Sequence, residues 1–512
     1  LFSIIEKFLI TKEMRSLSGI IEVAIMTSPG DFSCDYDCYY CPNQPGMPRS
    51  YIKEEPAVRR AASNDFDTVK QVYDRLTTYS LNGHPIDKLE IIVLGGTWSS
   101  YPKSYQQTFI RDLYYAANTF FDSNNTKRLR KSLDQEKQIN QTSLCKIVGL
   151  TLETRPDSIN PKEISYFLGY GVTRVQLGIQ HTDDIILKKI NRGCYNQDSK
   201  NAIRYLKDAG FKIMIHIMPN LPFSTPDKDA DMFIEILQNE DLQADEWKIY
   251  PTSVTTTSDK DDTEVNTVIE KWYRDGKYKP YPESELLEVI KYAKAAIHPY
   301  IRISRIFRDI PKPNIIGGAT IPHMRQVLQK EMAEDGLYCR CIRCCEVKDK
   351  IVEVDDIKLV ERTYEASGGL EMFLSFESLE ANNQEKRTIH AFLRLRLSEN
   401  TYRPSLKNTA LVRELHVYGK LIPTYLSKLQ TNNQHQGLGG RLLKRAEEIA
   451  RENQYDKIAI ISGVGVREYY KKKGYCLDDS YMMKDLNNNY NMIIRLILTI
   501  LIATSIIVIV CL

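Results

Sequence analysis

Short apolar runs alternate with amphipathic segments over the first half of the chain. The runs are rich in isoleucine and valine, and they cover residues 20–26, 89–94, 146–152, 174–179, 212–218 and 246–250. Most are too short for helices, so they predict buried strands. Between the first two, residues 67–82 carry apolar side chains at helical spacing, and Gly83 closes that segment. Six strands joined by helices predict an α/β fold, a parallel sheet that closes partway into a (β/α) barrel with its chemistry at the carboxyl ends of the strands.

A second pattern of strands and one strong helix covers residues 351–486. Short alternating strands at 372–377, 389–395 and 410–418 precede a glycine turn, an amphipathic helix at 438–454 and a strand at 457–462. They predict a separate α/β domain. We therefore divide the chain into an N-terminal segment (1–19), the barrel (20–310), a linker (311–350), the second domain (351–486), a polar spacer (487–491) and an apolar tail (492–512).

The tail has the pattern of a membrane anchor. Residues 496–512 contain no charged side chain, and at 1.5 Å per residue they span about 26 Å, close to a hydrocarbon core of about 30 Å. Arg495, just before them, can extend its charge to the interface. We expect a C-terminal transmembrane helix that anchors the chain to the endoplasmic reticulum or the mitochondrial outer membrane, with the other domains on the cytoplasmic side. The alternative is a helix buried in the fold or in a partner of a cytoplasmic protein.

Composition narrows the class of protein without deciding it. Hydrophobic residues make up 42% and charged residues 26% of 512, which excludes a mostly disordered or wholly membrane-embedded chain. The net charge of +3 means that any nucleic-acid site must be a local patch. The 11 cysteines are an odd number, and seven of them fall into two tight clusters. Metal sites in a reducing compartment explain that distribution better than a disulfide scaffold does.

The first cluster follows the first predicted strand and has the spacing C-x₃-C-x₂-C. Cys34, Cys38 and Cys41 on such a loop can hold three irons of a 4Fe–4S cube and leave the fourth iron open. An open iron can be chelated by S-adenosylmethionine, whose reductive cleavage gives a 5′-deoxyadenosyl radical. A zinc loop is the alternative, but it would bring a second pair of ligands nearby, and none follows.

With that placement, the chain resembles the radical S-adenosylmethionine superfamily and, more narrowly, the family of Elongator catalytic subunits. The narrower resemblance covers about residues 20–486 and rests on IDKLEIIVLGGT (86–97), GLTLETRPD (149–157), RVQLGIQH (174–181) and RIFRDIP (305–311). It implies that cofactor-binding groups end successive strands of the barrel. These groups are Gly95, Gly96, Glu153, Arg155, Gln176 and Lys248, with Gln180 and His181 as further candidates.

Each of these positions also has a physical interpretation. Gly95 and Gly96 allow the backbone to approach the methionine part of the cofactor, or they form an ordinary turn at a strand end. Glu153 and Arg155 suit its amino and carboxylate groups, or they form a buried ion pair. Lys248 can bind an anionic substrate or cofactor, as a catalytic residue, or its long side chain can simply extend to solvent.

The second cluster has the spacing C-x-C-x₂-C. The resemblance implies a structural zinc site with Cys339, Cys341 and Cys344 as three of the four tetrahedral ligands. Cys345 is either an alternative ligand or a bystander, and the sequence does not name the fourth ligand. A redox-active thiol cluster is the other interpretation.

The helix at 438–454 opens on a second cofactor motif. Gln434, Gln436, Gly437, Leu438 and Gly439 fit the Q-x-x-G-x-G turn of GCN5-related N-acetyltransferases, or GNAT domains, in which backbone amides bind the pyrophosphate of acetyl-coenzyme A. The resemblance places Tyr469 or Tyr470 near the thioester sulfur, as a catalytic group or cofactor contact. Packing in the core is the alternative for either tyrosine, and Lys471, Lys472 and Lys473 either pair with phosphates or face water.

Together the two halves imply one enzyme. The resemblance implies a tRNA carboxymethyluridine synthase, in which hydrogen abstraction from the acetyl group lets its carbon add to C5 of the wobble uridine, and thioester hydrolysis leaves a carboxymethyl group. Partners would be tRNA, accessory Elongator subunits and an electron donor. The RNA phosphates would meet basic residues at 59–60 and 127–131 and at Arg302, Arg305 and Arg308, unless these only face solvent. The alternatives are a protein lysine N-acetyltransferase and an inactive structural subunit.

Overall fold

The computed structural model describes residues 10–487, except 31–33, 124–126, 257–266, 349–355, 381–382, 420 and 422–436. Its first half contains a seven-stranded sheet in the order β1-β2-β3-β4-β5-β6-β8, with every neighbouring pair parallel. The strands are β1 (Ile21–Met26), β2 (Lys88–Leu94), β3 (Lys146–Thr154), β4 (Arg174–Gln180), β5 (Lys212–Ile217), β6 (Glu246–Ile249) and β8 (Arg302–Arg305). The predicted partial barrel is confirmed. It has one more strand than the apolar runs indicated, since β8 has the sequence RISR and is not an apolar run.

Helices cover this sheet because parallel neighbours need crossover connections. Side chains of the preceding residue fix the first turn of some of these helices: Asp67 accepts from Lys70 N at 2.8 Å and Asn160 accepts from Glu163 N at 3.0 Å. The helices of this half are α2 (Pro56–Ala62), α3 (Thr68–Leu81), α4 (Lys103–Thr119), α5 (Leu133–Asn140), α6 (Pro161–Tyr170), α7 (Asp184–Lys189), α8 (Asn196–Asp208), α9 (Pro226–Gln238), α10 (Val268–Arg274), α11 (Glu283–Ala296), α12 (Met324–Glu334) and α13 (Ile342–Cys345). A small sheet joins β7 (Ser253–Thr255) to β9 (Ile315–Gly318).

A second seven-stranded sheet, in the order β10-β11-β12-β13-β14-β16-β15, forms the other half. Its strands are β10 (Lys358–Ala366), β11 (Gly369–Glu380), β12 (Asn383–Leu397), β13 (Thr409–Val417), β14 (Lys457–Ile461), β15 (Cys476–Asp478) and β16 (Tyr481–Asp485). The helices are α14 (Leu438–Glu452), which packs on this sheet, and α15 (Arg467–Lys471). All neighbours are antiparallel except β13 and β14.

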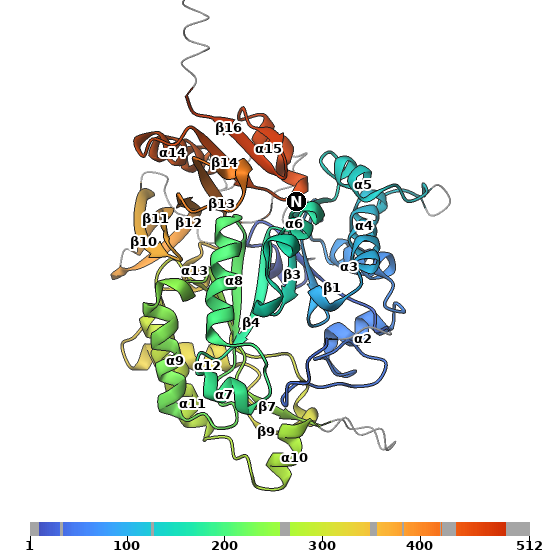
Figure 1. The fold of residues 1–512 in the computed structure, drawn as a ribbon, viewed down its shortest axis with the longest axis vertical. Coiled ribbons are helices and arrows are strands. Elements are labelled where there is room, and N and C mark those ends of the chain that lie inside the picture. The colour runs from blue at the N-terminus through green and yellow to red at the C-terminus, as the bar shows by residue number, and fades with distance from the viewer. Residues whose placement is uncertain are drawn as a thin grey trace, which may run out of the picture.

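The two sheets meet at a boundary that contains buried charges. Arg413 of β13 donates two hydrogen bonds to Asp245, just before β6, at 2.8 and 2.6 Å. Arg396 of β12 pairs with Asp208 of α8 at 2.6 Å, and all four side chains are buried. Figure 1 shows the second sheet and α14, in orange and red, set against one end of the barrel. Ion pairs that span the boundary therefore fix the two halves to each other.

The expected C-terminal transmembrane helix requires a correction. No helix in the described part of the chain is long and apolar enough to cross a membrane. The predicted anchor at 492–512 lies outside the described residues. Within the described residues the fold is a partial barrel followed by an α/β domain, and the expected transmembrane tail and placement on a membrane find no support there.

Candidate functional site

A cavity of about 260 Å³ lies inside the barrel. The strands supply much of its wall, and residues 302–310 and the segment after the first cysteine cluster supply most of the rest. Among the residues expected to bind the cofactor, Glu153, Gln176, Lys248 and Gln180 line it. They come from β3, β4 and β6, so parallel pairing brings side chains that are far apart in sequence into one space.

Gln176 is the centre of a buried hydrogen-bond network in this cavity. Its Oε1 accepts from Lys248 Nζ at 2.5 Å and lies 2.9 Å from His216 Nε2. His216 Nδ1 lies 3.7 Å from one oxygen of Glu153, and the hydroxyl of Tyr51 donates to the other at 3.5 Å. Gln176 Nε2 is buried and has no hydrogen-bond partner among the described residues, so this amide can donate to a ligand.

Burial favours the neutral form of each ionisable group in the network. It lowers the pKa of Lys248 to about 8, although the carboxylate of Glu153 opposes the shift. Burial also raises the pKa of Glu153, against the opposing charges of Lys248 and Arg308. The pKa of His216 falls well below its usual value because of burial and then the charge of Lys248. Groups held in this way respond strongly to a charged ligand and can transfer protons near neutral pH.

The cavity wall carries more basic than acidic side chains. The basic ones are Arg60, Arg174, Lys248, Arg302, Arg305, Arg308 and Arg343, and the acidic ones are Glu22, Glu55, Glu153 and Asp309. Some are already paired, since Arg308 donates to Glu55 at 2.8 Å. The surplus of positive charge favours an anionic ligand. Of the basic residues expected to hold RNA, four lie in this wall, namely Arg60, Arg302, Arg305 and Arg308. Arg128 is instead paired with the buried Glu136 at 2.6 Å.

The first cysteine cluster lies in a cationic environment. Arg155 Nη1 is 3.7 Å and Arg192 Nη1 is 3.6 Å from the sulfur of Cys38. Burial raises the pKa of Cys41, and the charge of Arg49 opposes that rise. Guanidinium groups around thiols stabilise thiolates and the negative charge of the cluster that they bind. These residues therefore fit an iron–sulfur cluster.

The zinc alternative for Cys34, Cys38 and Cys41 is not favoured by their arrangement. Within the described ranges, the one set of three potential ligands with donor atoms inside 4.8 Å of one another lies elsewhere in the chain. A single zinc ion needs its ligands close together, whereas each cysteine of a cube binds a different iron. The wider arrangement suits a cluster.

Gly95 and Gly96 allow close approach between strand ends and the cysteine loop. Their φ angles are +143° and +85°, and a Cβ on Gly95 would lie 1.8 Å from Thr27 Oγ1. A Cβ on Gly96 would lie 2.9 Å from a backbone oxygen of the loop. Thr97, the next residue, has its Oγ1 3.2 Å from the sulfur of Cys34. The glycines thus have a packing role that the sequence had left open.

Arg155 does not reach the cavity, although it was expected to bind the cofactor there. Its guanidinium donates to Asp157 at 3.0 and 2.9 Å and stacks 3.4 Å from the ring centre of Tyr36. It supports the cysteine loop, and its expected role in cofactor binding stays a prediction. His181 is also outside the cavity, because its Nε2 pairs with Asp229 at 3.1 Å. The sequence analysis missed His216, whose alternation with Met214 on β5 and with Met218 just after it was a usable signal.

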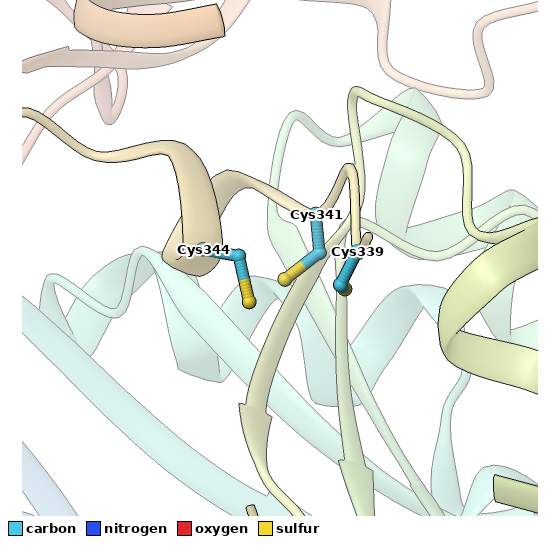
Figure 2. A group of neighbouring side chains, drawn as sticks. All are labelled: Cys339, Cys341 and Cys344. Carbon is cyan, nitrogen blue, oxygen red and sulfur yellow. The ribbon is translucent and has the colours of Figure 1, made fainter. Parts of the chain in front are cut away.

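The second cysteine cluster forms a compact group. The sulfurs of Cys339, Cys341 and Cys344 lie within 4.8 Å of one another. Figure 2 shows Cys339 and Cys341 on the loop before α13 and Cys344 on that helix, with the sulfurs of Cys341 and Cys344 directed into the same space. Cys345 is not in the group, because its sulfur is directed at the backbone oxygen of Cys339, 4.0 Å away. Three thiolates in this arrangement can bind one metal ion.

The second domain has an opening between β13 and β14. These parallel strands pair only from Thr409 to Val412, although β13 continues to Val417. Helix α14 begins beside β13 after Gly437, which has φ +76°. A Cβ on Gly439 would lie 3.3 Å from Val417 and 3.4 Å from the hydroxyl of Tyr469. The end of the β13–β14 pairing and the amides of the first turn of α14, which have no partner within the helix, therefore lie near each other.

The two candidate tyrosines have different environments. Tyr469 is 39% exposed and lies at the start of α14, whereas Tyr470 is 6% exposed and packs against Tyr475 in the core. Tyr470 therefore has a packing role, and its expected place near a thioester stays a prediction. Gln434 and Gln436, also expected to bind coenzyme A, lie outside the described residues. Lys473 is near the same turn, since its Nζ would lie 3.3 Å from a Cβ on Gly440.

Comparisons with known proteins agree with this arrangement. The radical SAM superfamily matches residues 32–233, and the radical SAM C-terminal domain matches residues 244–334. The tRNA uridine(34) acetyltransferase of Methanocaldococcus infernus is 40% identical over 93% of this chain and 87% of its own length. That of Dehalococcoides mccartyi is 39% identical over 93% of this chain and 100% of its own. Elongator complex protein 3 of Saccharomyces cerevisiae is 35% identical over 92% of this chain and 84% of its own length.

A solved structure extends the similarity to three dimensions. The archaeal Elp3 of Methanocaldococcus infernus with an N-terminal deletion superimposes with a TM-score of 0.77 at 37% identity, over 92% of this chain and 100% of that one. A radical SAM domain uses a 4Fe–4S cluster and S-adenosylmethionine, so the expectation of these two cofactors is confirmed for the first half. The chain belongs to the family of Elongator complex protein 3 and the tRNA uridine(34) acetyltransferases.

Proposed function

We propose that this protein modifies the wobble uridine of tRNA and forms 5-carboxymethyluridine with acetyl-coenzyme A as the carbon donor. The names of the relatives support tRNA uridine as the substrate. The observation that carries the proposal is the presence of two unlike sites in one rigidly joined chain. One is a basic cavity beside three cysteines, and the other is an opening between parallel strands at a helix start.

The two sites are connected by direct contacts across the domain boundary. Arg302 lines the cavity, and its Nη1 donates to the hydroxyl of Tyr418 at 3.0 Å. Tyr418 directly follows β13, the strand that borders the opening. Arg302 also donates to Glu346 at 2.9 Å, close to the second cysteine cluster. A chain that only acetylated protein lysines would have no use for the cavity and its cysteines.

In this proposal Cys34, Cys38 and Cys41 hold the cluster, which when bound supplies reductive cleavage of S-adenosylmethionine and thereby hydrogen abstraction. Gln176 donates from its unpartnered amide to the bound cofactor, and Lys248 and Glu153 hold charged groups in the cavity. Low solvent access keeps water away from the reacting atoms. An electron donor and, by analogy with relatives named as Elongator complex proteins, accessory subunits would be partners.

The second domain would bind acetyl-coenzyme A. Gly437, Leu438 and Gly439 present the amides of the first turn of α14 to the pyrophosphate. Tyr469, at the same turn, orients or protonates the thioester sulfur. We also propose that Cys339, Cys341 and Cys344 hold a structural zinc ion, which would fix the loop before α13 against the barrel.

The test follows labelled acetyl-coenzyme A under anaerobic reducing conditions with S-adenosylmethionine. Purified tRNA and a lysine-rich protein are offered in parallel, and nucleosides are analysed by mass spectrometry. We expect label in 5-carboxymethyluridine that depends on S-adenosylmethionine. Label in protein lysine alone, independent of S-adenosylmethionine, would contradict the proposal and favour a protein acetyltransferase.

A further inference from the structure

Phe223 is held in an unusual position beside the barrel. It lies in the loop between β5 and α9, its side chain is 46% exposed, and its φ angle is +72°. Asn220 in the same loop has φ +65°. A positive φ is unfavourable for a bulky residue, and such strain persists only where surrounding contacts fix the loop.

Those contacts come from one buried carboxylate. Asp229 accepts from Asn220 N at 2.6 Å and from the hydroxyls of Tyr281 and Ser224 at 2.6 Å each. His181 Nε2 lies 3.1 Å from the same side chain. Asp229 is fully buried, so these bonds are shielded from water. The loop is therefore rigid, and it directs a large apolar ring toward solvent.

The ring belongs to a small aromatic group with a cation. The ring centres of Phe223 and Trp272 are 5.7 Å apart at 78°, and Tyr39 packs on Trp272 at 5.3 Å and 82°. Lys189 Nζ lies 4.5 Å from the centre of the Phe223 ring. Lys188 and Lys189 are both exposed at the end of α7. Phe223 is exposed and Trp272 is half-buried, and aromatic rings next to lysines have the composition of surfaces that bind single-stranded nucleic acid.

This group borders the cavity. Tyr39 and Tyr40 lie between Cys38 and Cys41 of the first cysteine cluster, and Tyr40 lines the cavity. Strand β7 separates the two spaces, because Ser253 and Thr255 line the cavity while Val254 packs in the cluster that contains Trp272. A nucleotide next to one that enters the cavity would therefore pass close to the aromatic group.

We propose that Phe223 and Trp272 form a stacking surface for an unpaired base beside the modified nucleotide of the RNA substrate. Lys189 leaves the phenyl face when the base stacks there and, with Lys188, meets the adjacent phosphate. Every base has an apolar face, so this surface positions the strand without reading its sequence. The inference rests on the proposed function, since it needs a single-stranded RNA segment at the cavity.

The first test measures binding of unmodified tRNA to the reconstituted protein. Phe223→Ala should raise Kd about tenfold, the size expected from losing one stacked base, whereas Phe223→Tyr should stay within about twofold. Alanine is no easier to hold at a positive φ than phenylalanine, so the substitution mainly removes the ring. Phe121→Ala, which removes a 58% exposed ring after α4, is the matched control and should not change Kd.

The second test reads the contact directly. Trp98 and Trp247 are buried, so of the three tryptophans Trp272 should respond to a stacked base, and its fluorescence should be quenched by an anticodon stem-loop RNA. Equal Kd for Phe223→Ala and the unmodified chain, with no quenching, would overturn the stacking surface while carboxymethylation continued. Failure of the unmodified chain to bind any tRNA would overturn the proposed function and this inference together.

Discussion

Replacing Arg413 should weaken the attachment between the two halves of the molecule and lower the free energy of unfolding. Its guanidinium donates to Asp245 at 2.8 and 2.6 Å and to Glu371 at 3.0 and 2.7 Å, and all three side chains are at most 1% exposed. Arg413→Met would leave two buried carboxylates without their main partner, which costs about 3–5 kcal/mol. Lys207 remains 3.9 Å from Asp245 and 3.4 Å from Glu371, so we expect a value near the lower limit.

The assay is urea unfolding at pH 7, followed by far-UV circular dichroism and by the fluorescence of Trp247, which lies two residues after Asp245. The matched control is Arg445→Met. Arg445 pairs with Glu361 at 2.7 Å on the surface, where such pairs contribute less than about 1 kcal/mol. Equal losses for Arg413→Met and Arg445→Met would refute the reasoning.

The ion pair between Arg413 and Asp245 also predicts that stability depends on pH. Burial alone would raise the pKa of Asp245, but Arg413, Lys207 and Arg394 hold that pKa well below its usual value. A carboxyl with a lowered folded-state pKa stabilises the fold above its unfolded pKa of about 3.9, and this contribution is lost as the pH falls further. The stability difference between the unmodified chain and Arg413→Met should therefore shrink below about pH 4. A constant difference down to pH 2 would contradict the assignment.

Four further predictions concern the sites. Cys38→Ala should remove the 4Fe–4S absorption after anaerobic reconstitution, while Cys145→Ala, a buried thiol in the core, should retain it. Because the pKa of Lys248 is about 8, affinity for S-adenosylmethionine, measured by equilibrium dialysis, should fall as the pH rises through 8, and Lys248→Arg should abolish that fall. Gly439→Leu should weaken acetyl-coenzyme A binding at least tenfold by calorimetry because its Cβ would already contact Val417, and unchanged affinity would exclude that site. Cys344→Ser should lower both the zinc content, measured by elemental analysis, and the thermal midpoint of unfolding. Equal values for the variant and the unmodified chain would disprove the zinc site.

The local features of this protein follow from its sequence. Apolar runs of the right length and the helical spacing between them predicted the parallel sheet, because a buried strand and an amphipathic helix each need a fixed periodicity. The spacing of Cys339, Cys341 and Cys344 predicted a group of metal ligands, and their sulfurs do lie within 4.8 Å of one another. The weakly apolar β8 was missed because half of its residues are arginine.

Contacts between distant segments were decided only by the tertiary structure. The partners Arg413 and Asp245 are 168 residues apart, and no pattern in either segment indicates the other. Arg155 turns toward the cysteine loop and Tyr470 into the core, because neighbours from other elements occupy the space around them. Sequence periodicity specifies which face of an element is buried, but the partner across that face depends on how the elements pack, and so cavity residues such as His216 and Tyr51 became known only from the fold.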